Sequence, residues 1–235
     1  MDIYTVICTR NKQLSTVTQK LLTYMYACKA EVILIIGAKS IFYAYEKAIQ
    51  HIKPKNDDIV IFCHDDIEIR TPPEVFVEKL KSSFTNRTAF VGVAGTTHLS
   101  QDAVWWNWNI HSQGKHRGRV FHVAKKGDML FNHNIYATEY GPEGNVVVLD
   151  GLFLAARGEF LNSFNFTKPT YFEGEWDFYD IHYTHTAYMM GFINRAIIID
   201  IVHHSSGELV GRDSWHQNQQ AFIRTASLPV ELKES

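Results

Sequence analysis

The sequence predicts an α/β protein with a mostly parallel central sheet of Rossmann type, flanked by helices. Strand-like and helix-like segments alternate over the first 70 residues, which is the pattern of strand–helix–strand units. The strand-like segments are continuous apolar runs such as "EVILII" and "IVIFC", typical of parallel strands covered on both faces. The chain has 235 residues, 46% of them hydrophobic, and we expect residues 1–235 to form one domain with a large core.

The elements of the first part have recognisable signatures. Ser40 is a suitable N-cap for a helix whose apolar residues recur at helical spacing on one face. A proline near the first turn of "TPPEVFVEKL" marks the start of another helix. We expect strands at 3–9, 30–38, 57–66 and 88–96, and helices at 12–28, 40–52 and 71–84.

The second part is less regular. Residues 98–145 show no clear periodicity, so we expect an insertion or loop region over one side of the sheet. Residues 145–160 predict a strand, a turn at Asp150–Gly151 and a second strand. A loop should then lead into a helix over 173–191, and a last buried strand should cover 193–207.

Charge and cysteine content restrict the class of protein. The formal charge is -2 and the pI is about 6.6, which disfavours binding to nucleic acid. Cys8, Cys28 and Cys63 form an odd set without paired spacing, which favours a reducing compartment. The sequence has no signal-peptide pattern and no apolar run long enough for a membrane span, so we expect a soluble cytoplasmic protein; peripheral membrane attachment stays open.

Polar residues gather where the predicted strands end. His64, Asp65 and Asp66 follow one buried strand, and His203 and His204 end the last one. Ligands bind outside the carboxyl ends of strands in open α/β sheets, so these side chains should converge. Imidazole and carboxylate groups together suit a divalent cation, and a cation suits a phosphate. The alternative is that the acidic pair only caps the next turn.

Several segments in order resemble one family. They are "SIFYAYEKAIQHIKPKNDDIVIFCHDDIEI", "VGVAGTTHLSQDAVWW", "VVVLDGLFLAARGEF", "WDFYDIHYTHTAYMMGF" and "IIIDIVHHSSGEL". Together they are similar to family-2-like, StrF-type glycosyltransferases of the GT-A fold over residues 1 to about 215. The resemblance implies a nucleotide-binding half at 1–97 and an acceptor-binding half at 98–235.

The resemblance also implies an activity. A sugar would move from a nucleoside-diphosphate sugar, with a UDP-sugar as the expected donor, to the hydroxyl of a glycan, a lipid-linked acceptor or a small molecule. Mn²⁺ or Mg²⁺ would neutralise the diphosphate leaving group. Asp66 would be the chief metal ligand, assisted by His64 or Asp65, with His203 or His204 as a late histidine ligand.

The remaining site residues follow from the same resemblance. Thr9 and Arg10 would lie against the nucleotide, Lys39 would reach a phosphate, and the Asp150–Gly151 pair would face the sugar and the acceptor. In the segment "YDIH", Asp180 takes the place of the catalytic base of inverting members, with Asp177 in reserve. His182 stands where the family usually has a second acid, which puts that acid's contact with the acceptor in doubt.

Two other functions compete with the transferase. His64, Asp66 and His203 also read as a 2-His-1-carboxylate site for Fe(II), with Arg212 and Ser214 placed as in a 2-oxoglutarate dioxygenase. Such enzymes are double-stranded β-helices, whereas this chain predicts helices between buried strands. The second alternative is a GT-A-like module that binds a nucleotide sugar without turnover.

Three further sets of residues each have two alternative roles. His182 and His185 would bind a metal or form ordinary hydrogen bonds. The tryptophans 105, 106 and 108 would stack on a sugar or pack in the core. The basic stretch at 114–119, with Lys115, Arg117 and Arg119, would cover the diphosphate or remain a solvated loop.

Overall fold

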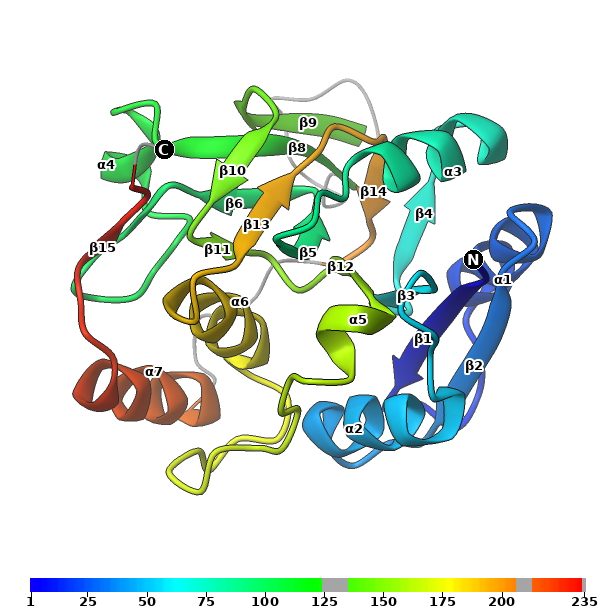
Figure 1. The fold of residues 1–235 in the computed structure, drawn as a ribbon, viewed down its shortest axis with the longest axis horizontal. Coiled ribbons are helices and arrows are strands. Elements are labelled where there is room, and N and C mark those ends of the chain that lie inside the picture. The colour runs from blue at the N-terminus through cyan, green and yellow to red at the C-terminus, as the bar shows by residue number, and fades with distance from the viewer. Residues whose placement is uncertain (124–134, 206–212, 234–235) are drawn as a thin grey trace.

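The computed structural model describes residues 1–123, 135–205 and 213–233, and two sheets dominate it (Figure 1). The first sheet, of seven strands among these residues, has the order β10-β13-β5-β12-β3-β1-β2. Its strands are β1 (Ile3–Thr9), β2 (Glu31–Ile36), β3 (Ile59–Cys63), β5 (Thr88–Gly92), β10 (Gly144–Val146), β12 (Phe153–Arg157) and β13 (Ile193–Ala196). The predicted α/β fold is therefore confirmed.

The pairing in this sheet is mixed, which corrects the expectation of a mostly parallel sheet. β1 runs parallel to β2 and β3, and β5 runs parallel to β13. β12 lies antiparallel between β3 and β5, and β10 lies antiparallel to β13. The parallel arrangement of the first three strands follows from the helices between them, because a parallel connection needs a crossover.

A second sheet lies beside the first and has the order β11-β6-β8-β14-β4, with β9 paired to β8. Its strands are β4 (Ile67–Ile69), β6 (Ala94–Thr96), β8 (His116–Val123), β9 (Ile135–Gly141), β11 (Val148–Leu149) and β14 (Ile201–His203). A short pair joins β15 (Val230–Glu231) to β7 (His98–Leu99). Both large sheets draw strands from both predicted halves of the chain, and the division at residue 97 stays a prediction.

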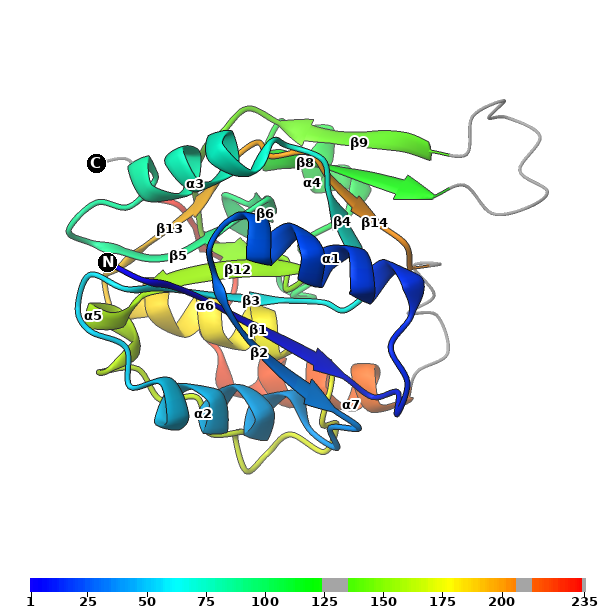
Figure 2. The ribbon, with the colours of Figure 1, turned by 90° about the vertical axis from the view of Figure 1, so that its right-hand side faces the viewer.

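Helices cover the two faces of the first sheet (Figure 2). The helices are α1 (Thr16–Ala27), α2 (Ile41–Ile52), α3 (Pro73–Ser82), α4 (Trp108–His111), α5 (Gly158–Leu161), α6 (Tyr179–Met189) and α7 (Asp213–Thr225). Tyr24 of α1 packs on Phe76 of α3 on one side, and Phe42 of α2 packs on Tyr183 of α6 on the other. The predicted helices at 12–28, 40–52 and 71–84 are confirmed, and the first begins only at Thr16 because the Ser15 side chain caps it.

Two predicted strands are each split between the two sheets and a third ends early, which corrects the prediction. The segment 88–96 forms β5 and β6, the segment 193–207 contains β13 and β14, and the segment 57–66 ends at β3 before β4 begins the second sheet. Hydrophobic periodicity does not reveal such crossings, because the residues on both sides of each bend are buried. The loop His64–Asp66 thus lies where the two sheets separate.

The prediction that 98–145 is irregular is wrong for much of this segment. β8 and β9 form a long antiparallel pair, in which the residues of β8 alternate between buried and half-buried. Gly118 is required in β8, because its φ is +97° and a Cβ atom there would lie 1.9 Å from the Val93 carbonyl oxygen. The alternation was hidden in the sequence because His116 and Gly118 occupy buried positions and Phe121 a half-buried one.

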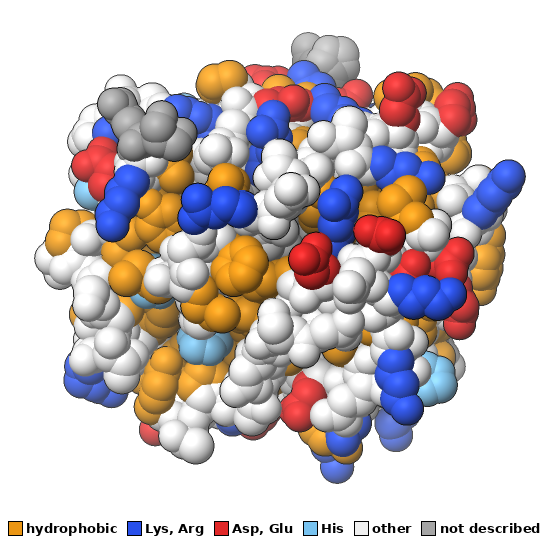
Figure 3. Space-filling view, in the orientation of Figure 1, with side chains coloured by type: hydrophobic (Ala, Val, Ile, Leu, Met, Phe, Trp, Pro, Cys, Tyr) orange, Lys and Arg blue, Asp and Glu red, His pale blue; other side chains and the backbone are white. Residues whose placement is uncertain are grey.

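Surface charge is mixed on the face drawn in Figure 3, where basic and acidic side chains intermingle. This agrees with the near balance of 23 basic and 25 acidic residues. In the part of the chain that the structure describes, no helix is long and apolar enough to cross a membrane.

Candidate active site

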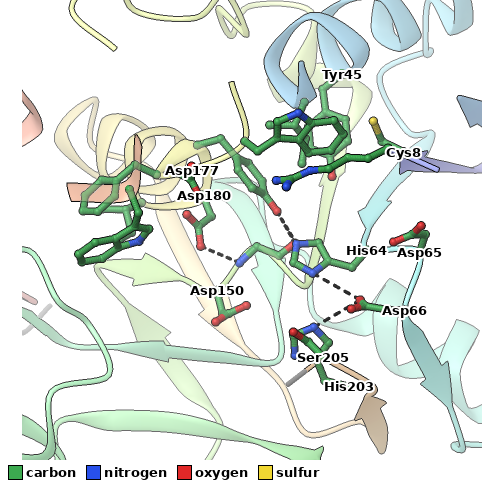
Figure 4. Close-up of a pocket in the computed structure, with 18 of the residues that line it drawn as sticks. Cys8, Tyr45, His64, Asp65, Asp66, Asp150, Asp177, Asp180, His203 and Ser205 are labelled. Carbon is green, nitrogen blue, oxygen red and sulfur yellow. Dashed lines mark hydrogen bonds and ion pairs between the residues drawn. The ribbon is translucent and has the colours of Figure 1, made fainter. Parts of the chain in front are cut away.

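A cavity of about 360 Å³ opens at the end of the first sheet, where the two sheets separate (Figure 4). Its walls come from the ends of β1 and β3, the β11–β12 turn, residues 176–181, β14 and α7. Asp177 and Asp180 lie on one side of the cavity, and His64, Asp66 and His203 lie on the other. Asp150 lies between these two groups. The strand-end residues from distant parts of the sequence therefore meet, as predicted.

His64, Asp66 and His203 form a compact cluster. One ligand atom of each lies within 4.8 Å of the others. The Asp66 Oδ1 atom is 3.4 Å from His203 Nε2 and 3.8 Å from His64 Nδ1. Among the described residues, neither Asp66 Oδ1 nor His203 Nε2 has a hydrogen-bond partner, although both atoms are buried. Buried polar atoms are normally paired, and a cation between these three side chains would satisfy them.

The hydrogen bonds of Tyr179 fix the tautomer of His64. The Tyr179 hydroxyl donates to the Gly151 carbonyl oxygen at 2.9 Å, since a carbonyl oxygen only accepts. The same hydroxyl oxygen is 2.9 Å from His64 Nε2 and therefore accepts a hydrogen bond from the Nε2–H group. In neutral His64 the unprotonated Nδ1 then faces Asp66, which is the state that a metal ligand needs.

Electrostatics in the cluster favour a single positive charge in the absence of a cation. Burial, followed by repulsion from His203, lowers the pKa of His64. Burial also lowers the pKa of His203, but the neighbouring Asp66 outweighs it, so that the pKa of His203 is raised. Burial alone would raise the pKa of Asp66, yet the two imidazoles lower it. A carboxylate held ionised between two imidazoles is a good site for a divalent cation, which takes the place of the proton.

The two adjacent histidines near the end of β14 have different surroundings. His204 Nε2 lies 3.6 Å from Glu68 Oε2, whereas His203 points at Asp66. We therefore expect His203→Asn to weaken Mn²⁺ binding by at least about 100-fold, because even outer-shell partners of a metal contribute 10–100-fold. His204→Asn should leave Mn²⁺ affinity within about threefold, since this imidazole lies outside the cluster. Titration calorimetry of both variants tests this, and equal losses would place both residues at the metal.

Asp180 and Asp150 form an acidic pair beside the cluster. The Gly151 backbone N–H donates to Asp180 Oδ2 at 2.9 Å, and the Leu152 N–H donates to Asp150 Oδ1 at 2.8 Å. Burial, reinforced by repulsion from Asp150, raises the pKa of Asp180 to about 7. A carboxylate with a pKa near neutrality is a far better proton acceptor than an ordinary aspartate.

Asp177 faces a different partner. Its Oδ2 atom accepts a hydrogen bond of 2.7 Å from the Ser214 hydroxyl of α7. Phe178, the next residue, has a φ of +69°, which is rare for a residue with a side chain and costs about 1–3 kcal/mol. This conformation turns the chain sharply at the start of α6, so that Asp177 and Asp180 both line the cavity.

Asn218 of α7 holds this strained segment in place. It is fully buried; its Oδ1 accepts from the N–H groups of Glu173 and Gly174, and its Nδ2 donates to the carbonyl oxygens of Gly174 and Asp177. Its replacement leaves several backbone groups unpaired in the interior, each of which is costly.

We expect Asn218→Ala to lower the free energy of unfolding by roughly 3 kcal/mol or more, because two N–H groups and two carbonyl oxygens lose their partner. Gln217→Ala, at an exposed position of the same helix, should change it by less than about 0.5 kcal/mol. Urea denaturation measures both. A loss below about 1 kcal/mol for Asn218→Ala would show that α7 does not hold the segment.

Some of the other predicted site residues line the cavity and some do not. Arg10, Asp65 and Gly151 line the cavity, and the Arg10 guanidinium lies 4.2 Å from the centre of the Trp176 ring. Thr9 is buried and its hydroxyl accepts from the Asn11 N–H, while the Lys39 side chain is exposed; neither residue lines the cavity.

The groups with two interpretations are also placed. His182 and His185 lie outside the cavity lining, and burial lowers the pKa of each to about 4. Basic residues 115, 117 and 119 do not line the cavity either. Lys115 pairs with Glu231, and Arg119 pairs with Asp200. The tryptophans divide: Trp105 is buried in the core, Trp106 lines the cavity, and the side chain of Trp108 lies outside the described part of the structure.

Several residues of the site escaped the sequence analysis. Tyr179 orients His64, Trp176 stacks on Arg10, and Asn218 connects α7 to the acidic segment. Ser214, which was considered only for the dioxygenase alternative, donates to Asp177. The sequence carries one usable signal for α7, an amphipathic pattern over 213–225 with buried Trp215 and Phe222 on one side.

The sheet order, the metal-type cluster and the acidic pair define a domain of the GT-A class. Residues 5–205 match the model of a family described as "Glycosyltransferase like family", and the chain belongs to this family. No curated protein sequence matches the chain.

Solved structures match the chain at low sequence identity. A197 from STIV matches with a TM-score of 0.50 and 13% identity, over 88% of this chain and 87% of that chain. GalNAc-T7 with UDP, GalNAc and Mn²⁺ matches with a TM-score of 0.48 and 12% identity, over 87% of this chain and 44% of that chain. At these identities the likeness concerns the fold alone.

Proposed function

We propose that this protein transfers a sugar from a nucleoside-diphosphate sugar to an acceptor hydroxyl, with inversion at the anomeric carbon. The observation that carries the proposal is the placement of Asp180 across the cavity from the His64–Asp66–His203 cluster, in a chain of the glycosyltransferase-like family. The first group is suited to remove a proton, and the second is suited to stabilise a leaving group. We propose UDP as the nucleotide of the donor.

Different residues of the chain would have different roles in the reaction. A divalent cation held by His64, Asp66 and His203 would supply charge neutralisation for the departing diphosphate. Arg10 would bind the diphosphate or the nucleotide. Asp180 would accept the proton of the acceptor hydroxyl while the new bond from the acceptor oxygen to the anomeric carbon forms and the bond to the phosphate oxygen breaks. Attack from the side opposite the leaving group gives inversion.

The ligand set of the cluster favours Mn²⁺ over Mg²⁺. Mg²⁺ prefers oxygen ligands in strict octahedral geometry, whereas two of these three ligands are imidazoles. We expect UDP with Mn²⁺ to raise the melting temperature by about 5–10 °C when the ligands are at about 100 times their dissociation constants. UDP with Mg²⁺ should give a smaller shift, and UDP with EDTA should give little.

The same thermal-shift panel separates the competing functions. A shift only with Fe²⁺ and 2-oxoglutarate under anaerobic conditions would sink the transferase and support the dioxygenase; Arg212 of that alternative lies outside the described residues. A shift with UDP and Mn²⁺, without hydrolysis of any UDP-sugar or transfer from it, would support the non-catalytic module. His182, which stands where the family usually has a second acid, does not line the cavity.

A further inference from the structure

An aromatic wall closes the cavity on the side of the acidic residues. It consists of Trp106, Phe178 and Trp215, which come from three separate parts of the chain and all line the cavity. The ring centres of Trp106 and Trp215 are 5.7 Å apart, and those of Trp215 and Phe178 are 5.2 Å apart. The aromatic wall is adjacent in sequence to the acidic residues, because Phe178 follows Asp177 and precedes Asp180 by two positions.

The rings of the aromatic wall differ in exposure in a way that indicates a binding face. Phe178 and Trp215 are buried, with exposed fractions of 2% and 8%; Trp215 contacts Trp106, and Phe178 contacts Trp215. Trp106 is half-buried and carries the accessible surface of the wall. Its neighbour Trp105 is only 1% exposed and packs on Tyr140 and His116, as a core residue does. Two adjacent tryptophans thus have opposite environments, and only Trp106 is left open to the cavity.

Trp176 is a weaker candidate for the same role. The Arg10 guanidinium lies over its ring, and its Nε1–H donates to the Lys39 carbonyl oxygen at 3.0 Å. One face of this ring is therefore already covered, and its contacts connect it to the ends of β1 and β2. The ring contacts of Trp106 are with Trp215 of α7 and, edge-on, with Trp105 instead.

We propose that the aromatic wall is the acceptor subsite and that the acceptor is a carbohydrate. The inference rests on the transferase function proposed above. A pyranose ring has an apolar face of C–H groups, which packs on an aromatic ring, and an edge of hydroxyl groups, which needs polar partners. The lining of the cavity includes groups suited to each part of the sugar. Trp106 would pack on the apolar face, and Asp180 and Asp177 would bind the hydroxyl groups. Asp180 already accepts from the Gly151 N–H and Asp177 from the Ser214 hydroxyl, so an alkyl chain would remove water from both carboxyl groups without adding a hydrogen bond, which is unfavourable.

The test compares Trp106→Ala, Trp106→Tyr and the control Tyr43→Ala. Tyr43 is an aromatic residue of α2 that is 61% exposed and does not line the cavity. Each variant is assayed with the best UDP-sugar and Mn²⁺, first without acceptor for hydrolysis and then with methyl glycosides of glucose, galactose, mannose and N-acetylglucosamine. A serine-containing peptide and a long-chain alcohol serve as the other acceptor classes.

We expect methyl glycosides to accept the sugar, and Trp106→Ala to raise their KM by at least about tenfold, since a stacked ring contact is lost. Donor hydrolysis and acceptor KM should stay within about twofold in Tyr43→Ala, and Trp106→Tyr should recover most of the acceptor affinity. An unchanged acceptor KM in Trp106→Ala, or transfer to the peptide or the alcohol alone, would overturn the carbohydrate subsite while leaving the transferase intact.

Failure of the proposed function gives a different result. If the unaltered protein neither binds nor hydrolyses any nucleoside-diphosphate sugar, the transferase is refuted, and saturation-transfer NMR with the same methyl glycosides then decides the subsite by itself. Binding that disappears in Trp106→Ala supports the subsite. Binding that is absent, or equal in both proteins, overturns it.

Discussion

The Asp66→Asn substitution is expected to lower metal-dependent turnover by on the order of 1,000-fold or more. The Asp66 carboxylate is the only anionic member of the His64–Asp66–His203 cluster, so its loss removes the charge that holds a divalent cation between two imidazoles. Lewis-acid stabilisation of a leaving group contributes several kcal/mol, and each 1.36 kcal/mol corresponds to a factor of ten in rate. Initial rates of release of the nucleoside diphosphate, measured over a range of Mn²⁺ concentrations, check this.

Glu68→Gln is the matched control for this variant. Glu68 lies two residues further on, contacts Lys20, Arg70 and His204, and does not line the cavity. Its turnover should stay within about twofold of the unaltered protein, and its Mn²⁺ dependence should be the same. Full activity of Asp66→Asn would refute the metal site, because no other cluster of this kind occurs in the described part of the chain.

Asp180→Asn is expected to stop transfer while donor binding stays near normal. A positioned general base contributes typically 10²–10⁴-fold to the rate, so we expect the rate of transfer to fall within this range. An asparagine oxygen still accepts the hydrogen bond from the Gly151 N–H, and the segment should therefore keep its shape. UDP affinity by calorimetry and transfer rate, measured side by side, test the assignment. Collapse of donor affinity would instead place Asp180 in donor binding.

The pKa of Asp180 also predicts how the rate depends on pH. Only the carboxylate accepts a proton, and its pKa in the folded protein is about 7. The value of kcat/KM should therefore rise about tenfold per pH unit below pH 7 and level off above it. In Asp180→Asn this acidic limb should disappear. If Asp177→Asn removes the limb and Asp180→Asn keeps it, then Asp177 is the base.

Stability gives an independent readout of the same group. The folded pKa of Asp180 lies above the usual value of 3.8, so the folded state binds this proton more tightly than the unfolded state. The resulting stabilisation is complete below about pH 4 and is lost as the pH rises through 7. In EDTA, Asp180→Asn should therefore melt at a higher temperature than the unaltered protein at pH 8. An inactive but more stable variant cannot owe its inactivity to unfolding.

Much of the first sheet could be predicted from the sequence. The runs that form β1, β2 and β3 are apolar enough to be buried on both faces, and the capping residues Ser15 and Ser40 act locally. The convergence of His64, Asp66 and His203 was also predictable, because the carboxyl ends of neighbouring strands meet at one edge. The later strands were less predictable, because β5–β6 and β13–β14 bend from one sheet into the other without a break in burial.

The amino-acid sequence by itself determined the α/β class, the family, and the residue types gathered at the strand ends. Those properties depend on local periodicity and on the order of segments along the chain. Only the tertiary structure decided which of two adjacent histidines faces Asp66, which nitrogen of His64 is free, and that α7 supports the acidic segment through Asn218. The reason is physical: each of these depends on contacts and fields between residues that are distant in the sequence, and a side chain's direction and pKa are set by those neighbours.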